Sequence, residues 1–510
     1  MRATYHVQVD WDDDGDFDRP EETLDRDVIA LEWALGLDDP GATLAAASWA
    51  RITLRNPLGR YLPESASSPL AGAIVPRKRM RITSTYDGVT RTHFTGWLEQ
   101  ITPGRDLTVT LVCGGLEGLL QRAEVFLPLL VDVTADAVIG AALAQVDYPP
   151  ALLGYWQLGL ARLGQDTRLP DLTTYADLAP GRTRFAYVGD FQTPVSAWEV
   201  LRQAVAAERG LCFVNREGRV VFWNRHHLLL ADTPAATLTA READFTTTTG
   251  GAAMVNCAEV TCHPREVGSA PETLWMLRRP LRLPAGQAVT IRAPFDQAEP
   301  GVRVGALSLE AMIPGSDYTA SDNPAGGADH TAEVAAQVTP AGSSAAITFT
   351  SSAGRALYIL PGARLRGYAV RDRGQVAVRA EDRLSVLHYG RRMAALDLPL
   401  LSALEDAQGV ARQLVLDGAE PRATVQTVTL DAQAARSALP VMLATTVGDC
   451  VMLEDALTGY SGRVHVLGER HRVARGGAAH TVTWVVRPAS RWTYWRLGAA
   501  ALGTGTRLVY

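Results

Sequence analysis

The alternation of hydrophobic and polar residues along the chain predicts a mainly β protein with a few helices. Short runs in which apolar and polar residues alternate are separated by glycine and proline, as in strands with one buried face. The first quarter of the chain holds six such runs, at residues 6–10, 29–35, 50–55, 80–85, 94–101 and 107–113. We therefore expect a β-meander there.

Three segments have the apolar period of a helix: residues 135–145, 194–208 and 400–416. In the second segment, Thr193 is a suitable N-cap before Pro194, and Gly210 is a suitable stop. The residues that follow, LCFVNREGRVVFWN at 211–224, predict a β-hairpin that turns at residues 215–218. This region is therefore expected to be a helix-plus-hairpin module.

A long, divergent repeat links the two ends of the chain. The motifs ARITL, MRIT, FTGWLEQI and DLTVTLVC lie in this order between residues 50 and 113. The motifs VQTVTL, CVML, YSGRVHVL and AHTVTWVV follow the same order between residues 425 and 486. The pattern predicts two related β-domains, although any two β-meanders share some of it. We expect MVNCAEVTCHP at 254–264 to be the first strand of the second domain, which would make that domain discontinuous.

A second, shorter repeat is sharper. WQLGLARLGQDTRL at 156–169 matches WRLGAAALGTGTRL at 495–508 in identical register.

Between the two copies of the long repeat, residues 281–366 are rich in Ala, Gly, Thr and Ser and favour short strands, which predicts an inserted β-sandwich. The expected domains are the first β-domain (1–125), the helix and hairpin module (126–245), the second β-domain (246–268 with 375–490), the sandwich (269–374) and a C-terminal docking segment (491–510).

Composition narrows the class of protein. A length of 510 residues with 47% hydrophobic content and a net charge of −6 indicates a folded chain of several domains. No apolar run reaches 18 residues and the N-terminus has no apolar signal region, so we expect neither a membrane span nor a Sec signal peptide. A pI near 6.0 argues against general nucleic-acid binding.

The five cysteines are scattered, which favours buried free thiols over a disulfide framework. Cys257, Cys262 and His263 are close in sequence, but the two cysteines are five residues apart on a predicted strand and so point to opposite faces. A zinc site there is the less favoured alternative.

The strongest local motif is DWDDDGDFDRPE at residues 10–21. Calcium requires six to eight oxygen ligands, and a DxDxDG run with a distal glutamate supplies them while the glycine permits a sharp turn. The motif predicts a structural calcium site in a β setting, or alternatively a solvated acidic turn. The predicted ligands are Asp10, Asp12, Asp14, Asp16 and Glu21, with Asp18 at the remaining position of the spacing.

Signatures of catalysis are missing from the sequence. It contains no GxSxG, HExxH, Walker or GxGxxG motif in a suitable context, so we predict no enzyme, no catalytic residues and no organic cofactor. His465, His471 and His480 lie on successive predicted strands and could converge on one face. An exposed or hydrogen-bonded histidine is the more usual outcome for each.

Several of these motifs resemble phage tail-tip hub proteins, the family that contains the baseplate hub of contractile-tailed phages and its minor tail protein relatives in siphophages. VDWDDDGDF at 9–17 is similar to the opening of many siphophage minor tail proteins, and ITLRNPLGRYLPE at 52–64 to their first tube-like domain. The segment at 193–225 resembles the helix and hairpin module that follows. VLHYGRRMAALDLPLL at 386–401 and the run from GDCVML to GERHRV resemble the second tube-like domain.

The resemblance implies a structural role. Three copies with two tube-like domains each would form a pseudo-hexameric ring that adapts a six-fold tail tube to a three-fold tip. The implied partners are a distal tail or tail-tube protein on one side and tip, fibre or receptor-binding proteins on the other. DNA would pass through the lumen without specific binding, and the homotrimer would belong to the virion tail tip after assembly in the host cytoplasm.

Three alternatives remain at this point. The chain could be the hub of a phage-derived contractile injection particle. It could be a carbohydrate-binding tail component that contacts host glycans through Phe295, Tyr318, Phe349 and Tyr358 of the sandwich. A polysaccharide-degrading enzyme with two carboxylates in a cleft is the third alternative.

Overall fold

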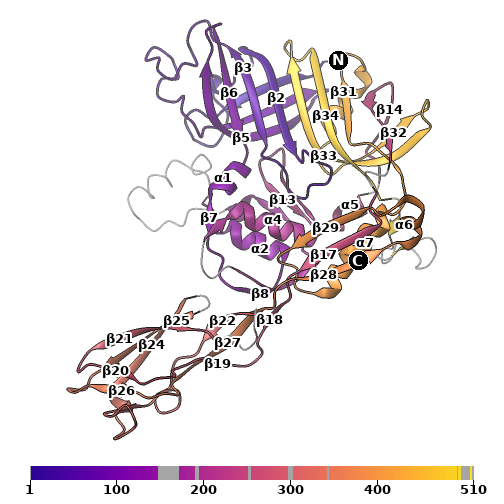
Figure 1. Cartoon of the computed structure of the whole chain (residues 1–510). Helices are drawn as coiled ribbons and strands as arrows, with labels where there is room; N and C mark the ends of the chain where they lie inside the picture. Colours follow the sequence, from indigo (N-terminus) through magenta and orange to yellow (C-terminus); the bar gives the residue numbers. More distant parts are fainter. Residues whose placement is uncertain are drawn as a thin grey trace.

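The protein is mainly β, with a few short helices between its sheets, as the sequence predicts (Figure 1). The computed structural model describes residues 2–147, 172–189, 194–231, 233–250, 254–296, 302–341, 344–490, 492–494 and 506–507. The helices of these residues are all too short or too polar to cross a membrane.

A twelve-stranded sheet dominates the structure and contains strands from both ends of the chain (Figure 1). The strands of its first half correspond to the six predicted runs: β1 (Thr4–Val9), β2 (Val28–Gly36), β3 (Trp49–Arg55), β4 (Arg79–Tyr86), β5 (Val89–Pro103) and β6 (Thr108–Gly114). The strands of its second half are β14 (Ala236–Thr239), β15 (Ala243–Phe245), β31 (Thr427–Asp431), β32 (Cys450–Asp455), β33 (Tyr460–Ala474) and β34 (Ala479–Pro488).

The two halves of this sheet have the same strand order. The first half runs β1-β4-β5-β6-β3-β2, and the second runs β14-β32-β33-β34-β31-β15. The long strands β5 and β33 are each 15 residues, and each has an irregularity in its pairing with the next strand, between Leu98 and Gln100 in β5 and between Val466 and Gly468 in β33. The long sequence repeat is therefore a structural repeat. The halves differ at one edge, because β1 pairs antiparallel with β4 whereas β14 pairs parallel with β32.

The predicted first strand of the second domain lies elsewhere, which corrects the sequence analysis. Cys257–Cys262 forms β17, which pairs with β28 (Val376–Glu381) and β29 (Met393–Leu398) in a separate three-stranded sheet. Its Ala258, Val260 and Cys262 pack in one hydrophobic cluster with helix α7 (Leu404–Gly418). The position expected for it is taken by β14. Strand patterns report burial on a face, and the choice of pairing partner is non-local.

The three predicted helices are present with shifted ends, as α2 (Ala135–Leu143), α4 (Ala197–Glu208) and α7. Helix α4 begins after the predicted start because β11 (Val195–Ser196) pairs with β7 (Glu124–Val125), and Ser196 is the N-cap, accepting from the amide of Glu199. The predicted cap Thr193 lies outside the described residues. Arg209, with φ of 59°, ends the helix in the left-handed conformation one residue before the predicted Gly210.

The predicted hairpin is confirmed as β12 (Leu211–Val214) and β13 (Val220–Trp223), and Asn215 and Gly218 close its turn by a backbone hydrogen bond of 3.0 Å. The module around it also contains β8 (Leu130–Thr134), β9 (Ala176–Leu178) and β10 (Arg184–Val188). The remaining α-helices of the described residues are α1 (Glu117–Arg122), α5 (His227–Leu230), α6 (Arg383–Tyr389) and α8 (Leu439–Ala444).

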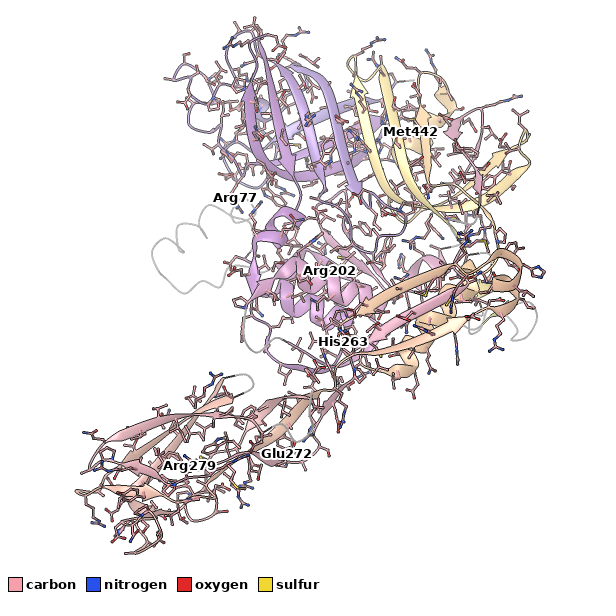
Figure 2. The ribbon with its side chains drawn as sticks, in the orientation of Figure 1. Arg77, Arg202, His263, Glu272, Arg279 and Met442 are labelled. Carbon is pink, nitrogen blue, oxygen red and sulfur yellow. The ribbon has the colours of Figure 1, made fainter. Side chains whose placement is uncertain are left out.

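The inserted β region projects away from the rest of the protein (Figure 1). Figure 2 shows Glu272 and Arg279 on this projection, far from Arg77, which precedes β4, and from Met442, which lies on α8 and packs in the core of the second half. Three small sheets surround one hydrophobic core there. Their strands are β18 (Arg265–Val267), β19 (Glu272–Met276), β20 (Leu281–Leu283), β21 (Ala288–Pro294), β22 (Arg303–Leu309), β23 (Ala320–Ser321), β24 (Val334–Ala341), β25 (Ser344–Ser351), β26 (Leu357–Ile359) and β27 (Arg364–Asp372).

The short sequence repeat lies almost wholly outside the described residues. Of its second copy, only Thr506–Arg507 is described, as β36, which pairs in parallel with β35 (Thr493–Tyr494).

The two halves of the large sheet meet where β2 pairs antiparallel with the C-terminal half of β33, a joint that we call the seam. Gly36 and Gly468 are opposite each other at one end of it. A Cβ atom on Gly468 would lie 1.9 Å from the carbonyl oxygen of Leu37. The close approach of the two backbones therefore requires glycine at this position.

We expect Gly468→Ala to destabilise the protein by about 1–3 kcal/mol, because the backbone of residue 37 must move to admit the methyl group. Gly354→Ala is the control, since a Cβ atom there meets nothing within 4 Å and its φ is not in the left-handed range. Chemical unfolding followed by tryptophan fluorescence measures both. Equal stability of the two variants would contradict the close approach.

Candidate functional site

The seam holds a buried polar network at the centre of the molecule. The turn of the β12–β13 hairpin inserts Arg216 beneath β33, where its Nε donates to Glu469 Oε1 at 2.7 Å and its Nη2 to Glu469 Oε2 at 2.5 Å. The same guanidinium donates to the carbonyl oxygens of Leu443 (3.0 Å) and Thr445 (2.6 Å). Arg216 therefore ties the middle module to both the second half of the sheet and the loop after α8.

The charges of this ion pair are fixed by their mutual contact. Burial alone would raise the pKa of Glu469, but the adjacent Arg216 guanidinium outweighs burial and holds that pKa well below its usual range. The pKa of Arg216 is raised in turn, because Glu469 outweighs the burial that would lower it. Both groups remain charged in the interior. Removing either one would leave the other as a buried charge without a partner.

A chain of histidines extends the network across the seam to the first half of the sheet. His471 Nε2 lies 3.3 Å from Glu469 Oε2, and His471 Nδ1 lies 2.9 Å from His480 Nε2. His480 Nδ1 is 2.7 Å from the hydroxyl of Tyr5 on β1. The ring of Trp33 on β2 stacks on His471 with centroids 4.6 Å apart. The predicted convergence of histidines thus holds for His471 and His480.

Two further histidines, His465 and His93, lie on the same long strands β33 and β5. His465 precedes the β33 irregularity and lines a different pocket, near Arg487. His93 on β5 bonds Ser84 at 2.7 Å, and its ring centroid is 6.0 Å from that of His471. Burial lowers the pKa of both His93 and His480 well below the ordinary value, and burial also lowers that of His471 although Glu469 opposes it. The cluster is closed to solvent and is suited to holding the seam rather than to acting on a substrate.

The sequence analysis missed Arg216 and Glu469. Arg216 occupies the centre of an ordinary polar turn, which gives no hint of burial. Glu469 carried a detectable signal: after Gly468, the positions Glu469, His471 and Val473 alternate as buried residues of β33. A charged residue at an inward-facing strand position indicates a buried partner.

The acidic loop between β1 and the turn η1 (Pro20–Glu22) gathers most of its predicted ligands. One oxygen each from Asp10, Asp12, Asp14 and Glu22 lies within 4.8 Å of the others. The predicted Glu21 is not in this group and is exposed, so Glu22 takes its place one residue later. The reason is that residues 20–22 form a turn of 3-10 helix, which directs Glu22 inward.

The remaining predicted ligand, Asp16, groups with Asp14 and Asp18 on the exposed side of the loop. Burial raises the pKa of Asp10 to about 6 and that of Glu22 to about 7, and neighbouring carboxylates of the loop add to both shifts. The loop therefore concentrates negative charge in a partly desolvated place.

The alternative zinc ligands do not assemble. Among the described residues, Cys257, Cys262 and His263 form no metal-ligand group, and His263 Nε2 instead lies 2.8 Å from Asp397 Oδ1. All five cysteines are free and buried, which confirms that part of the sequence analysis.

The aromatic residues proposed for glycan stacking are mostly internal. Phe295, Tyr318 and Phe349 belong to the buried core of the inserted β region. A buried ring offers no face to a sugar, so these three residues supply no stacking platform.

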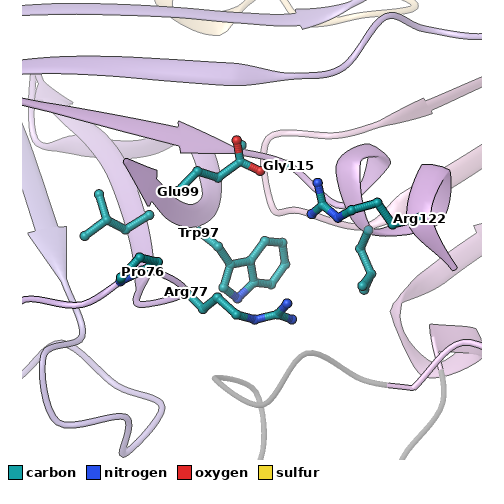
Figure 3. Close-up of a pocket in the computed structure, with 9 residues that line it drawn as sticks. Pro76, Arg77, Trp97, Glu99, Gly115 and Arg122 are labelled. Atoms are coloured by element: carbon teal, nitrogen blue, oxygen red, sulfur yellow. The ribbon is translucent and has the colours of Figure 1, made fainter. Parts of the chain in front are cut away.

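An open pocket of about 340 Å³ lies between the first half of the sheet and α1. Figure 3 shows the indole of Trp97 in this pocket, with Arg77, Glu99 and Arg122 around it. The indole nitrogen of Trp97 is buried and has no hydrogen-bond partner in the described part of the chain. The pocket adjoins residues 98 and 99 of β5, where that strand leaves β4.

Arg216→Ala is expected to lower the free energy of unfolding by about 3–5 kcal/mol, because it leaves the Glu469 carboxylate buried without its partner. The matched control is Arg470→Ala, which removes the ion pair from Arg470 to Glu32 (2.6 Å) across the same seam. Arg470 is 61% exposed, so its loss should cost no more than about 1 kcal/mol. Urea unfolding of both variants tests this, and similar losses in the two would contradict the assignment.

The histidine cluster predicts acid sensitivity. In the unfolded chain these histidines titrate near ~6.5, whereas folding holds them neutral, so the unfolded state binds more protons below that pH and stability falls. His480→Gln should flatten the fall between pH 7 and 5.5 by up to about 1.4 kcal/mol per pH unit. The exposed His388→Gln is the control and should leave the slope unchanged. Stability that is flat or rises on acidification would contradict the prediction.

Comparison with known proteins comes from structure alone. No protein-family model and no curated protein match this sequence. The structure is similar to a tail protein from Neisseria meningitidis, with a TM-score of 0.46 and 10% identity over 96% of this chain and 97% of that one. It is similar to the 43 kDa tail protein of prophage MuSo2 from Shewanella oneidensis (TM-score 0.45, 8% identity, 95% and 98% covered). Prophage tail protein gp18 from Listeria monocytogenes gives a TM-score of 0.40 with 7% identity, and 94% of each chain is covered. All three of these similar structures are tail proteins.

Proposed function

We propose that this protein is a structural hub of a phage-type tail, in which three copies form a ring of six similar units. The observation that carries the proposal is the seam: one chain already contains two sheets of identical strand order, joined edge to edge. A joint that links the halves within a chain can also link neighbouring chains, provided that the free edges match. The structure allows that match to be followed residue by residue.

The first free edge is the C-terminal part of β5, at residues 99–103. In the second half, β33 pairs with β32 only up to His465, and β2 pairs with it from Gly468 onward. In the first half, β5 pairs with β4 only up to Trp97, and on that side residues 99–103 have no partner strand among the described residues. An unpaired strand edge favours pairing with another strand.

The backbone hydrogen bonds of Leu98 in β5 and of Val466 in β33 follow the same pattern, so the two residues are equivalent in the two halves. Leu98 accepts from the amide of Arg77 and donates to the carbonyl of Lys78. Val466 accepts from the amide of Gly448 and donates to the carbonyl of Asp449. Leu98 therefore corresponds to Val466, and Gln100 corresponds to Gly468, the residue that meets Gly36 in the seam.

The second free edge is formed by β15 and β16 (Thr248–Thr249). They lie beside β31 and β30 (Ala423–Thr424) in the way that β2 lies beside β3, and their outer side has no strand partner in the described part of the chain. Counting along the chain from Phe245, which takes the place of Leu31, puts Thr248 at the position of Ala34 and Gly250 at that of Gly36. The pairing of β16 with β30 is shifted by one residue relative to that of β15 with β31. Thr248 of one copy would then be opposite Thr102 of the next, as Ala34 is opposite Arg470 in the seam.

The pocket beside Trp97 occupies the corresponding place in the first half. At the seam, Leu37 donates to the carbonyl of Leu467, and Arg487 donates to the carbonyl of Pro40 at 2.7 Å. Leu467 and Arg487 correspond to Glu99 and Gly114, and both of these line the pocket. The pocket is therefore where the chain following the edge strand of a neighbouring copy would enter.

Three copies joined in this way supply six units, which suits a chain between a six-fold tail tube and a three-fold tip. The inserted β region extends away from the sheet, and we assign to it the contact with tip, fibre or receptor-binding proteins (Figure 1). The sheet ring would stack on a distal tail or tail-tube protein, and its lumen would pass DNA. We place the assembled trimer at the tail tip of the virion.

The test joins the two edges covalently. In a Thr102→Cys/Thr248→Cys double variant, both new thiols lie on exposed strand residues, and all five native cysteines are buried. Oxidation of the full-length protein should give linked dimers and trimers on a non-reducing gel, because the paired residues would have Cβ atoms roughly 4.5–5.5 Å apart. Light scattering of the unmodified protein should give three times 54.8 kDa, which is 164.4 kDa.

Thr102→Cys/Thr290→Cys is the control, because Thr290 is an exposed strand residue of the projecting β region and should form no link. A trimeric mass without cross-linking would overturn this joint while leaving a trimeric hub. A monomer that also fails to form rings with tail-tube protein would overturn the hub itself.

A further inference from the structure

The acidic loop at residues 10–22 has features that the ring does not explain. Its carboxylates converge, yet they share few hydrogen-bond donors. Asp10 Oδ2 accepts from the amide of Gly15 at 3.0 Å, and Glu22 Oε2 accepts from the amide of Arg19 at 3.0 Å. These two bonds fold the loop and use one oxygen of each carboxylate.

The other oxygens of the same side chains have no hydrogen-bond partner among the described residues. Asp10 is 0% exposed and Glu22 is 1% exposed, and Asp10 Oδ1 and Glu22 Oε1 are buried without a hydrogen bond. Asp12 Oδ1 is also buried without a hydrogen-bond partner among the described residues. Buried carboxylate oxygens without donors are costly, and proteins retain them where a cation completes their coordination.

The charge in the loop is incompletely balanced. Lys78 pairs with Asp13 at 2.6 Å, away from the converging group. Arg19 pairs with Asp12 at 2.6 Å and is 3.6 Å from Asp14. Arg19 is 51% exposed, so it can move into solvent at little cost when a cation binds.

We propose that Asp10, Asp12, Asp14 and Glu22 bind one calcium ion. The donors are all hard carboxylate oxygens, with no histidine or cysteine in the group, which favours calcium over zinc or another transition metal. Four carboxylates in one loop suit the larger calcium ion, which accepts irregular coordination by oxygen, better than magnesium, which requires near-octahedral geometry. The ligand that ends the loop is Glu22 rather than the Glu21 of the regular spacing.

The ion would join the start of the chain to the sheet. The amide of Asp10 donates to the carbonyl of Arg79 on β4 at 2.9 Å, and Arg79 Nη1 donates to the carbonyl of Gly15 at 3.2 Å. The guanidinium of Arg81 lies 4.2 Å from the ring centroid of Phe17. Calcium would thus hold the loop against β4 at Arg79. Two residues earlier, the amide of Arg77 donates to the carbonyl of Leu98 on β5.

Calorimetric titration of calcium into the full-length, chelator-treated protein tests the assignment. We expect one ion per chain, tighter binding of Ca²⁺ than of Mg²⁺, and a rise in melting temperature with Ca²⁺. Asp10→Asn and Glu22→Gln should each weaken calcium binding by at least about tenfold, since each removes a ligand charge. Both variants should fold without calcium at least as well as the unmodified protein, because they remove a buried charge.

Glu21→Gln is the matched control and should bind calcium as the unmodified protein does. Loss of binding in Glu21→Gln with retention in Glu22→Gln would overturn the ligand set. Failure of the unmodified protein to bind calcium at millimolar concentration, or equal binding of magnesium, would overturn the calcium site.

Discussion

The pairing of β2 with the C-terminal half of β33 is the constraint on which the rest of this structure depends. It turns two separate meanders into one sheet, and it requires strands 438 residues apart in sequence to meet, as Glu32 and Arg470 do. Long-range pairing of this kind orders much of the chain at once, so it needs interactions that stabilise it specifically. The histidine chain, with its contacts to Tyr5 and Trp33, provides such interactions across the joint, and the Arg216–Glu469 ion pair supports it on the β33 side.

The buried network also explains why the middle module lies where it does. Arg216 is on the turn of a hairpin that belongs to neither half of the sheet, yet it bonds to carbonyl groups at the C-terminal end of α8 and to a carboxylate on β33. The same hairpin packs Leu211, Phe213 and Val221 against Leu37 and Leu467 beside the seam. An apolar contact could hold the hairpin, whereas the ion pair with its fixed geometry selects one position for it.

The proposed ring follows from the same joint. Within the chain, the seam pairs β2 of the first half with the C-terminal half of β33. The equivalent edges of the other halves, β15 with β16 and residues 99–103 of β5, have no strand partner on that side among the described residues. The loop that we assign to calcium lies next to one of these edges, through Lys78 and Arg79. Assembly and ion binding would therefore act on neighbouring residues of β4 and its preceding turn, although each is carried by its own observations.

The sequence by itself determined the local elements and their repetition. Alternating residues established the strands of the first half and strands β31, β32, β33 and β34 of the second half. The match between motifs such as FTGWLEQI and YSGRVHVL established that the halves are related, because side-chain period is a local property. It also marked the acidic loop, where Asp10, Asp12 and Asp14 converge, but it did not show that Glu22 would replace Glu21 or that Asp16 would lie outside the group.

Only the tertiary structure decided which strands pair, which glutamate turns inward and which charges are buried together. Cys257–Cys262 was recognisable as a strand, but its partners β28 and β29 follow from packing against α7. Arg216 is polar and lies in a turn, so its burial depends on a carboxylate 253 residues away. Such contacts form between segments distant along the chain, and their energy belongs to the assembled surfaces rather than to any local pattern of residues.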